Sequence, residues 1–369
     1  MAYITIQHAS RKWNISERRI QFLCSEGRLP GAIKFGRQWA IPEDNCKPLD
    51  ARIKSGKYIK HTRDSIAPLQ TIDLFCGCGG MSLGFQKAGF HIISAYDKWF
   101  AALKVYAANF SHPVFERDLA MKAAQDEIVS QRPDIIIGGP PCQDFSTAGH
   151  MNEGLGRARL SIVYSNIVSA AHPKFFVMEN VAIARKSEAY KKAIENYRKA
   201  GYGLTQILLD ASYCGVPQTR KRFFVIGELG GNDDFLTDRL KAHLAEKPMT
   251  IHDYLGDSLG VEYYFRIPTN YSRRGVFSIY APSQTIRAID RPIPKNYKKH
   301  KDDPVEIGPN VRALTVKERS YIQTFPDSFQ FQGTKTDLNT MIGNAVPVNL
   351  AKYVADALML YIQKKEWWR

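Results

Sequence analysis

The chain has 369 residues, of which 44% are hydrophobic, and its 51 basic against 36 acidic side chains give a net charge of +15. This length allows one large domain with one or two small ones, and the positive charge indicates a polyanionic partner. No apolar run approaches the roughly 20 residues of a membrane span and no signal peptide is evident, so we expect a soluble, intracellular protein without a membrane partner. The six cysteines lack paired Cys-x-x-Cys spacing, so neither a disulfide framework nor a metal site is expected.

Residues 3–45 predict a compact helical unit that ends in a hairpin. Thr5 is placed to cap a first helix, and Ser16 to cap a second helix that ends near Ser25. After a break that contains Gly and Pro, the alternating segment 33–42 predicts a small hairpin. This order resembles the winged helix-turn-helix of MerR and phage excisionase proteins, although short helices with basic faces also occur in generic helical caps.

The resemblance implies that the second helix of this unit enters the major groove of DNA and that the hairpin meets phosphate. The expected DNA contacts are Arg18, Arg19 and Gln21 on the helix and Arg37 on the hairpin. Residues 1–48 are therefore interpreted as a winged helix-turn-helix domain, and the polar, basic residues 49–68 as a linker.

From Thr71 onward, apolar strands alternate with helical patterns, which is the βαβ signature of a parallel sheet. The expected strands lie near 70–75, 91–96, 113–116, 134–138, 174–179, 205–210 and 222–227. Residues 228–340 break this rhythm and are rich in Tyr, Arg, Pro and Asn. A helix from about Val348 to Lys364 is expected to rejoin the first domain, which makes the middle region an insertion.

The expected carboxyl edge of this sheet suits a ligand that contains adenosine. The loop after the first strand holds Gly77, Gly79 and Gly80 and allows close approach of backbone to a ligand, a pattern that also serves dinucleotides. Asp97 closes the next strand, where a carboxylate can accept both hydroxyls of a ribose. Asp118 follows the third strand and can accept from an adenine amino group. Each aspartate also suits an ordinary turn at a strand end.

One cysteine stands in a rigid loop directly after the apolar run 135–137. Two glycines let the loop leave a buried strand, and Pro140 and Pro141 fix the backbone on the approach to Cys142. A thiol held in this way suits a nucleophile, whereas a lone cysteine in a turn is more often structural.

Two later motifs place charged groups at the ends of apolar strands. Glu179 and Asn180 follow the apolar residues 175–178, at the carboxyl edge of the strands, where open α/β sheets place their active-site residues. Arg220 and Arg222 enter another apolar strand. Each motif alone suits a strand end with solvated charges, but together with the cysteine loop they favour a catalytic site.

In this order the motifs resemble those of the cytosine-5 DNA methyltransferases. The matching segments are Asp73–Gly80, Pro140–Gln143, Glu179–Val181, Gln218–Arg222, Arg312–Thr315, Gln323–Asp327 and Gly343–Pro347. The resemblance covers roughly residues 70–360 and implies an α/β fold, namely a Rossmann-like domain with a mostly parallel sheet that uses S-adenosyl-L-methionine. It also implies that Phe75 packs near the adenine or the sulfonium and that Asn344 lines the cofactor pocket.

The resemblance further implies covalent chemistry on a cytosine flipped out of the duplex. The expected catalytic residues are Cys142, Glu179, Arg220, Arg222, Pro140 and Asn180. Cys142 is expected to attack carbon 6, and Glu179 to neutralise charge at ring nitrogen 3. The two arginines are expected to steady the base carbonyl and its sugar-phosphate, and the Pro140 carbonyl to accept from the cytosine amino group. Water is the expected base for the carbon 5 proton.

Two further segments are expected to contact DNA. The glycine-containing stretch 146–159 carries Arg157 and Arg159 and suits a mobile lid, although ordinary surface loops share this composition. The inserted region carries Arg273 and Arg274 among several tyrosines, and target choice is expected there. These aromatic side chains also suit a small core.

We therefore expect a catalytic domain at 69–228 that is completed by 341–369, with a small target-recognition domain at 229–340. The expected substrate is a specific sequence in double-stranded DNA, bound by a monomer in the prokaryotic cytoplasm in association with the nucleoid. A cognate restriction endonuclease is expected to act separately, and the amino-terminal domain to add DNA binding or transcriptional autoregulation. Two alternatives stay open: a tRNA cytosine-5 methyltransferase, and a transcriptional regulator in which methylation is secondary.

Overall fold

The computed structural model divides into two compact units, Met1–Ile66 and Ala67–Arg369, and each is described by itself. The described residues are 3–13, 15–25, 29, 32–36, 38–43, 69–141, 159–268, 273–289 and 291–366. Cys142, Arg37 and Arg157 lie outside them, and so does the expected lid up to Arg159.

In its described residues, the amino-terminal unit has two helices and a three-stranded sheet. Its elements are β1 (Tyr3–Thr5), α1 (Ile6–Trp13), α2 (Glu17–Ser25), β2 (Ile33–Phe35) and β3 (Gln38–Pro42). The two helices and the hairpin confirm the prediction, and Thr5 Oγ1 accepts from the His8 N–H at 3.2 Å, as a helix cap does. β1, which pairs antiparallel with β3, was not expected, because a three-residue strand is too short to leave a periodic signal. Ala9, Ile20 and Ile41 are fully buried in a core of this unit's own.

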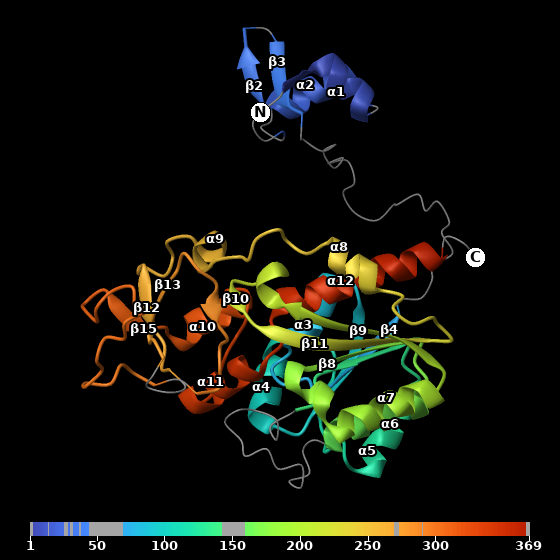
Figure 1. Ribbon diagram of the computed structural model, residues 1–369. Helices are drawn as coiled ribbons and strands as arrows, with labels where there is room; N and C mark the ends of the chain where they lie inside the picture. The colour runs from blue at the N-terminus through green and yellow to red at the C-terminus, as the bar shows by residue number, and fades with distance from the viewer. Residues whose placement is uncertain are drawn as a thin grey trace. The chain divides into compact units, whose positions relative to one another are not determined.

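A seven-stranded sheet organises the described part of the second unit (Figure 1). Its strands are β4 (Gln70–Leu74), β5 (His91–Asp97), β6 (Val114–Glu116), β7 (Ile135–Gly138), β8 (Phe175–Val181), β9 (Tyr202–Asp210) and β11 (Lys221–Leu229). The spatial order is β6-β5-β4-β7-β8-β11-β9, and neighbours from β6 to β8 pair in parallel. The mostly parallel sheet is thus confirmed, with β11 as the exception: it runs antiparallel to both β8 and β9. The first residues of β11 therefore lie beside the last residues of β8.

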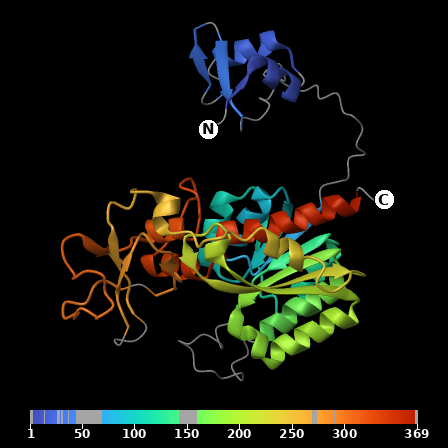
Figure 2. The same cartoon turned by 45° about the horizontal axis from the view of Figure 1, so that its top comes forward.

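Helices cover both faces of this sheet (Figure 2). They are α3 (Gly80–Lys87), α4 (Phe100–Asn109), α5 (Lys122–Ser130), α6 (Arg159–Ala171), α7 (Glu188–Lys199), α8 (Thr237–Ala242) and α12 (Val348–Glu366), with short 3-10 turns η3 (Ala182–Lys186) and η4 (Ala211–Tyr213). α3 and α12 pack on one face of the sheet, whereas α5, α6 and α7 pack on the other. Arg159, expected as the last residue of a lid, is the first residue of α6.

α12 brings the end of the chain back against α3, the helix that follows the first strand of the sheet. It crosses α3 at Gly84, where a β-carbon would lie 2.5 Å from the Ala351 Cβ, so only glycine allows this approach. The stretch Lys335–Lys365 is long and apolar enough to pass a composition test for a membrane span. However, 56% of its most apolar window is buried in the fold, as in the core helix of a globular protein.

The inserted region forms smaller elements at one end of the second unit (Figure 1). They are α9 (Ile251–Leu255), β12 (Tyr263–Phe265), β13 (Val276–Ser278), β14 (Ser283–Gln284), β15 (Val311–Ala313), α10 (Val316–Ile322) and α11 (Lys335–Asn344), and they lie with β10 (Gln218–Thr219), which precedes the region in the chain. β12 lies between β13 and β15, and β10 pairs in parallel with β14. Two apolar clusters hold these elements, so part of the aromatic content of this region forms a core.

Candidate active site

The turn between β4 and α3 adopts backbone angles that favour glycine. Phe75, Gly77 and Gly79 have φ values of 57°, 53° and 95°. A β-carbon on Gly79 or Gly80 would lie 2.3 Å from a ring or a carbonyl atom, so close packing requires glycine at both positions. A β-carbon on Gly77 would meet nothing within 4 Å. Space is therefore open over the middle of the turn, next to the half-buried Phe75.

Asp97 ends β5 beside this turn, and the backbone holds its carboxylate. Its Oδ2 accepts from the Gly77 N–H and its Oδ1 from the Trp99 N–H, both at 2.9 Å. Each oxygen keeps a second lone pair that can accept from a ligand hydroxyl. Asp118 is exposed, and its Oδ1 accepts from the Ala120 N–H at 3.0 Å in a local turn. Of the two aspartates, Asp97 is therefore the one joined to the glycine-rich turn.

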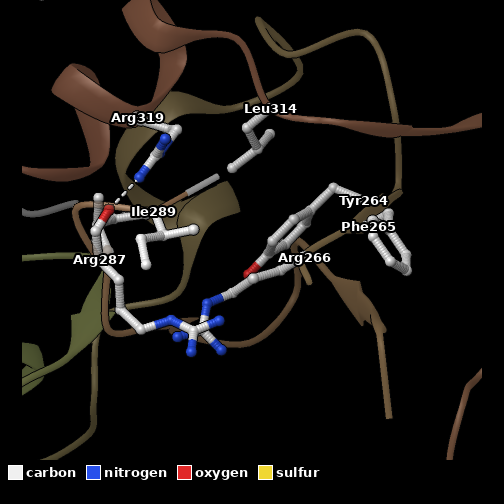
Figure 3. Close-up of a pocket in the computed structure, with 8 residues that line it drawn as sticks. Tyr264, Phe265, Arg266, Arg287, Ile289, Leu314 and Arg319 are labelled. Atoms are coloured by element: carbon white, nitrogen blue, oxygen red, sulfur yellow. Dashed lines mark hydrogen bonds between the residues drawn. The ribbon is translucent and has the colours of Figure 1, made fainter. Parts of the chain in front are cut away.

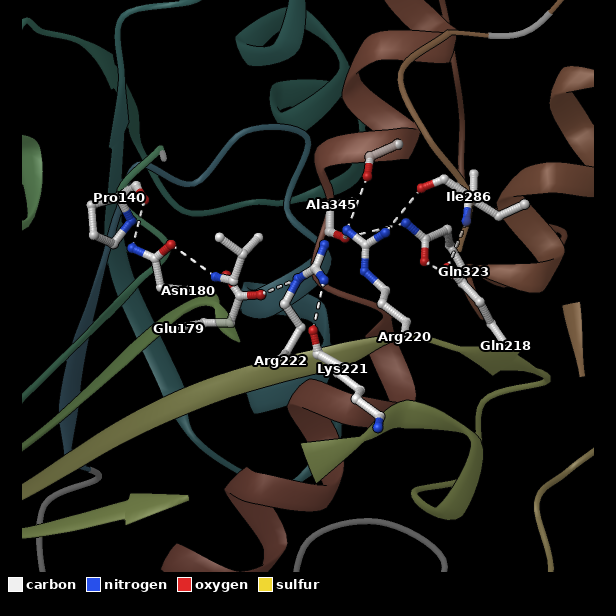
Figure 4. A network of polar contacts seen from close by, with 12 residues as sticks. Pro140, Glu179, Asn180, Gln218, Arg220, Lys221, Arg222, Ile286, Gln323 and Ala345 are labelled. Carbon is white, nitrogen blue, oxygen red and sulfur yellow. Dashed lines mark hydrogen bonds and ion pairs between the residues drawn. The ribbon is translucent and has the colours of Figure 1, made fainter. Parts of the chain in front are cut away.

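Glu179 and Arg222 form a buried ion pair at the carboxyl edge of the sheet (Figure 4). Arg222 Nε lies 2.8 Å from Glu179 Oε1, and the two side chains are only 13% and 11% exposed. The antiparallel pairing of β11 with β8 brings them together. Burial raises the pKa of the Glu179 carboxyl above its ordinary value, although the charges of Arg222 and Arg220 oppose this rise. A carboxyl with a raised pKa can share a proton with a bound base.

The loop after β7 lies against Glu179. A β-carbon on Gly139 would be 3.2 Å from Glu179 Oε2. Asn180 Nδ2 donates to the Pro140 carbonyl at 3.4 Å, and Asn180 Oδ1 accepts from the following backbone N–H at 2.8 Å. Glu179, Asn180 and Pro140 thus meet in space as the sequence motifs suggested, and Cys142 follows two residues after Pro140 in the chain.

Arg220 occupies a different place from the one expected. Its side chain is 1% exposed, and it donates to the carbonyls of Ile286, Gly343 and Ala345 at 3.0, 2.9 and 3.1 Å (Figure 4). Burial and the neighbouring Arg222 lower its pKa well below the ordinary value for arginine. Because its two amino groups are committed to backbone carbonyls, Arg220 joins the late segments of the chain to the sheet and does not steady a base.

Two glutamines that the sequence analysis did not single out extend this junction. Gln218 Nε2 donates to Gln323 Oε1 at 2.8 Å, and Gln218 Oε1 accepts from the Ile286 N–H at 2.8 Å. Gln323 Nε2 donates in turn to the Ala345 carbonyl at 3.2 Å. Both glutamines are 0% exposed. Their place in the motifs was visible in the sequence, but the partners of Gln218 are 68 and 105 residues away along the chain and leave no local pattern.

Asn344 ends α11 within the segment that Arg220 anchors. Its side chain is exposed, and two residues later the Val346 carbonyl packs against Gly80 of the glycine-rich turn. The segment after α11 therefore contacts the turn through Val346, and the lining of a cofactor pocket by Asn344 stays a prediction.

A buried polar chain beside the turn was missed by the sequence analysis. Asp73 is 1% exposed, and burial raises the pKa of its carboxyl to about 7. Ser82 Oγ donates to Asp73 Oδ2 at 2.6 Å and lies 2.7 Å from the Tyr106 hydroxyl, which lies 2.7 Å from His112 Nε2. Asp73 Oδ1 has no hydrogen-bond partner among the described residues. The one sequence signal was an acidic residue inside an apolar strand.

The expected DNA-binding residues are widely spread. Arg18 and Gln21 are exposed on α2, and Arg19 lies on the same helix. In the second unit, Arg159 is exposed at the start of α6. Arg273 and Arg274 are exposed before β13, and the guanidinium of Arg274 lies 4.7 Å from the centre of the Phe277 ring.

A small pocket in the inserted region is lined by Arg266, Arg287 and Arg319 (Figure 3). Arg266 donates to the Thr285 carbonyl at 2.9 Å, Arg287 to the Ile267 carbonyl, and Arg319 to the Arg287 carbonyl. Backbone contacts thus hold all three guanidinium groups in place, which makes this recess strongly cationic.

Comparisons with known proteins agree with the arrangement of these motifs. The family model described as C-5 cytosine-specific DNA methylase matches residues 69–359. Type II methyltransferase M.HindV of Haemophilus influenzae is 55% identical over 294 residues, which are 79% of this chain and 96% of that protein. Type II methyltransferase M.HgiDI of Herpetosiphon aurantiacus is 50% identical over 297 residues, which are 80% of this chain and 96% of that protein.

Solved structures share the fold of the second unit at low sequence identity. The Dnmt2 methyltransferase of S. pombe superposes with a TM-score of 0.59 at 16% identity and covers 80% of this chain and 99% of its own. The methyltransferase EhMeth of Entamoeba histolytica gives a TM-score of 0.58 at 19% identity, with 80% and 98% covered. At this identity the likeness concerns the fold alone.

Replacement of the buried guanidinium tests the structural place of Arg220. Arg220→Lys is expected to lower the free energy of unfolding by about 2–4 kcal/mol, because one ammonium cannot satisfy three carbonyls and the unmet groups stay buried. Urea titration followed by circular dichroism measures the loss. Arg185→Lys, at an exposed arginine of η3, is the control and should change stability by less than about 0.5 kcal/mol. Equal effects of the two substitutions would contradict the assignment of Arg220.

Proposed function

Because the chain belongs to the C-5 cytosine-specific DNA methylase family, we propose that it methylates carbon 5 of a cytosine in a specific duplex DNA sequence as a Type II modification enzyme. The chain is a DNA (cytosine-5-)-methyltransferase. The observation that carries the proposed chemistry is the buried Glu179–Arg222 pair against the loop that leads to Cys142.

The glycine-rich turn supports S-adenosyl-L-methionine as the methyl donor. The open space over Gly77 admits a ligand, and Asp97 has lone pairs that can accept from ribose hydroxyls. Phe75 and Asn344 would border the same space, and Asp118 would reach an adenine amino group from its exposed turn. When bound, S-adenosyl-L-methionine supplies an electrophilic methyl group on a sulfonium.

The nucleophile in this proposal is the Cys142 thiolate, which forms a bond to carbon 6 of the flipped cytosine. The ring electrons move toward carbon 5, and Glu179 holds a proton at ring nitrogen 3 to offset the developing charge. Arg222 fixes Glu179 in position, and the Pro140 carbonyl, oriented by Asn180, accepts from the cytosine amino group. After methyl transfer, loss of the carbon 5 proton to water breaks the sulfur–carbon bond and releases the thiolate.

The proposal also covers how the base is reached and where the enzyme acts. The segment 146–159, with Arg157 and Arg159, would close over DNA and hold the target base outside the stack. The inserted region, with Arg273 and Arg274, would choose the target sequence. The enzyme would act as a monomer on double-stranded DNA in the bacterial cytoplasm, at the nucleoid, and a cognate restriction endonuclease would act separately.

The amino-terminal unit is proposed as a second DNA-binding domain of the winged helix-turn-helix type. The family model begins at residue 69, so this unit lies outside the methylase match. It has its own apolar core, and Arg18 and Gln21 are exposed on its second helix. Arg19 and Arg37 would add contacts from the same helix and the hairpin. This domain would anchor the enzyme on DNA or regulate transcription of its own gene.

Covalent trapping tests the proposed nucleophile. Duplex DNA with 5-fluorocytosine at the target position should form a stable adduct with Cys142, because fluorine cannot leave carbon 5 as a proton does. Mass spectrometry locates the adduct, and Cys142→Ser should abolish both the adduct and methylation. Cys214→Ser, at a buried cysteine elsewhere, is the control and should keep both. Transfer of labelled methyl groups to tRNA instead of DNA would contradict the proposal.

The raised pKa of Glu179 leads to a second prediction for the chemistry. Glu179→Gln should lower the single-turnover methylation rate about 100- to 10,000-fold while DNA binding persists. In the wild type, the rate should fall on the alkaline side as Glu179 loses its proton, at a pH above the ordinary range for glutamate. The variant should lack this fall. Glu228→Gln, at another buried glutamate, serves as the control, and a wild-type pH profile retained by Glu179→Gln would refute the role.

A double substitution on α2 tests the amino-terminal domain. Arg18→Ala combined with Gln21→Ala should weaken binding to DNA from the protein's own promoter at least about tenfold, because both side chains would reach base edges or phosphate. Methylation of a duplex that contains the target sequence but is unrelated to the promoter should be unchanged. Electrophoretic mobility shift measures the binding, and Arg11→Ala on α1 is the control. Promoter binding by the double variant as tight as that of the wild type would contradict the proposed DNA-binding role of this domain.

A further inference from the structure

The segment between β14 and β15 carries a run of cationic side chains away from the active site. Its exposed cations are Arg291, Lys295, Lys298, Lys299 and Lys301. No ion pair joins any of the five to a carboxylate in the part of the chain that the structure describes. In the same unit, by contrast, Lys317, Lys352 and Lys365 each pair with a carboxylate. The run therefore concentrates positive charge, with the exposed Asp302 directly after it in the chain.

A buried carboxylate fixes the shape of this segment. Asp303 is 5% exposed, and its Oδ1 accepts from the N–H groups of Gly275 and Val276 at 3.0 and 2.9 Å. Its Oδ2 accepts from the Tyr297 hydroxyl at 2.7 Å and from the His300 N–H at 2.8 Å. Burial raises the pKa of this carboxyl, but the four hydrogen bonds outweigh burial and hold the pKa below its ordinary value. A run of solvated lysines would not require a buried, hydrogen-bonded carboxylate. The contacts of Asp303 therefore indicate that the segment adopts one fixed conformation.

The anchored segment adjoins the arginine-lined pocket of the inserted region. Tyr297 packs edge-on against Phe265, with ring centres 5.2 Å apart, and Phe265 is one of the residues that line that pocket. The carboxylates Asp257, Glu262 and Glu306 line a separate groove on the inserted region. Positive charge therefore gathers on the anchored segment and in the pocket beside it, which suits a polyanionic ligand.

We propose that residues 291–301 form a preformed phosphate-binding arm that contacts the backbone of duplex DNA beside the target site. Asp303 is its positioning residue: it touches no DNA but holds Tyr297 and His300, and with them the lysines, in one arrangement. The arm supplies affinity and orientation. This inference rests on the proposed function and adds to it a surface that binds the DNA backbone.

The salt dependence of DNA binding tests the arm directly. The triple variant Lys295→Ala, Lys298→Ala, Lys299→Ala should reduce the slope of log affinity against log salt by up to about 2.7, or about 0.9 for each phosphate that the arm no longer neutralises. KM for DNA should rise while kcat at saturating DNA stays unchanged. The control, Lys199→Ala, Lys241→Ala, Lys247→Ala, removes the same charge from exposed lysines of α7 and α8 and nearby, and should leave the slope unchanged.

Asp303→Asn and Tyr297→Phe test the positioning role, because both keep every lysine. Each should reduce the salt slope, and Tyr297→Phe should do so with a melting temperature close to that of the wild type. A wild-type slope in the lysine variant, or an equally reduced slope in the control, would overturn the arm while DNA methylation by the wild type still supports the function. Absence of methylation by the folded wild type would overturn the proposed function itself.

Discussion

The antiparallel direction of β11 is the constraint on which the candidate site depends. In a sheet of uniformly parallel strands, Arg222 at the start of its strand and Glu179 near the end of another would lie at opposite edges. The reversal of β11 pairs Arg222 with Val181 and places the guanidinium against the Glu179 carboxylate. Burial of that carboxylate becomes tolerable because a cation is held at 2.8 Å, whereas a lone buried charge would be strongly unfavourable.

The same reversal lets the chain at the start of β11 contribute both to the candidate site, through Arg222, and to the junction with later segments, through Arg220. Arg220 precedes Arg222 by two residues and points its guanidinium at backbone carbonyls of segments that arrive much later in the chain. Gln218 adds contacts to Gln323 and to Ile286. Most acceptors in this junction are main-chain carbonyls, but close packing also matters, because a β-carbon on Gly343 would lie 2.3 Å from the Ala288 nitrogen. The junction therefore holds the late segments beside the catalytic edge through backbone contacts and a required glycine.

The sequence predicted the strands and the clustering of Glu179, Asn180 and Pro140, because apolar runs and strand-end polar residues are local signals. It did not predict the direction of β11, since the alternation of side chains along a strand is the same in both directions. The place of Arg220 depended on that direction and on partners far along the chain. The sequence motif therefore identified Arg220 as a notable residue but could not predict its hydrogen-bond partners. The Asp73 chain was missed for a similar reason: Tyr106 and His112 come from other elements that only the fold brings together.

The positive charge of the chain divides into two physically different sets. The two amino groups of buried Arg220 donate to carbonyls and buried Arg222 pairs with a carboxylate, and a planar guanidinium with several donors suits such fixed contacts. The lysines of the anchored segment are exposed and form no ion pair within the described part of the chain, and flexible ammonium groups suit the irregular spacing of phosphates. Screening by salt acts on the exposed set and hardly on the buried one. Ionic strength should therefore change the affinity of the enzyme for DNA, while the geometry of the Glu179–Arg222 pair stays the same.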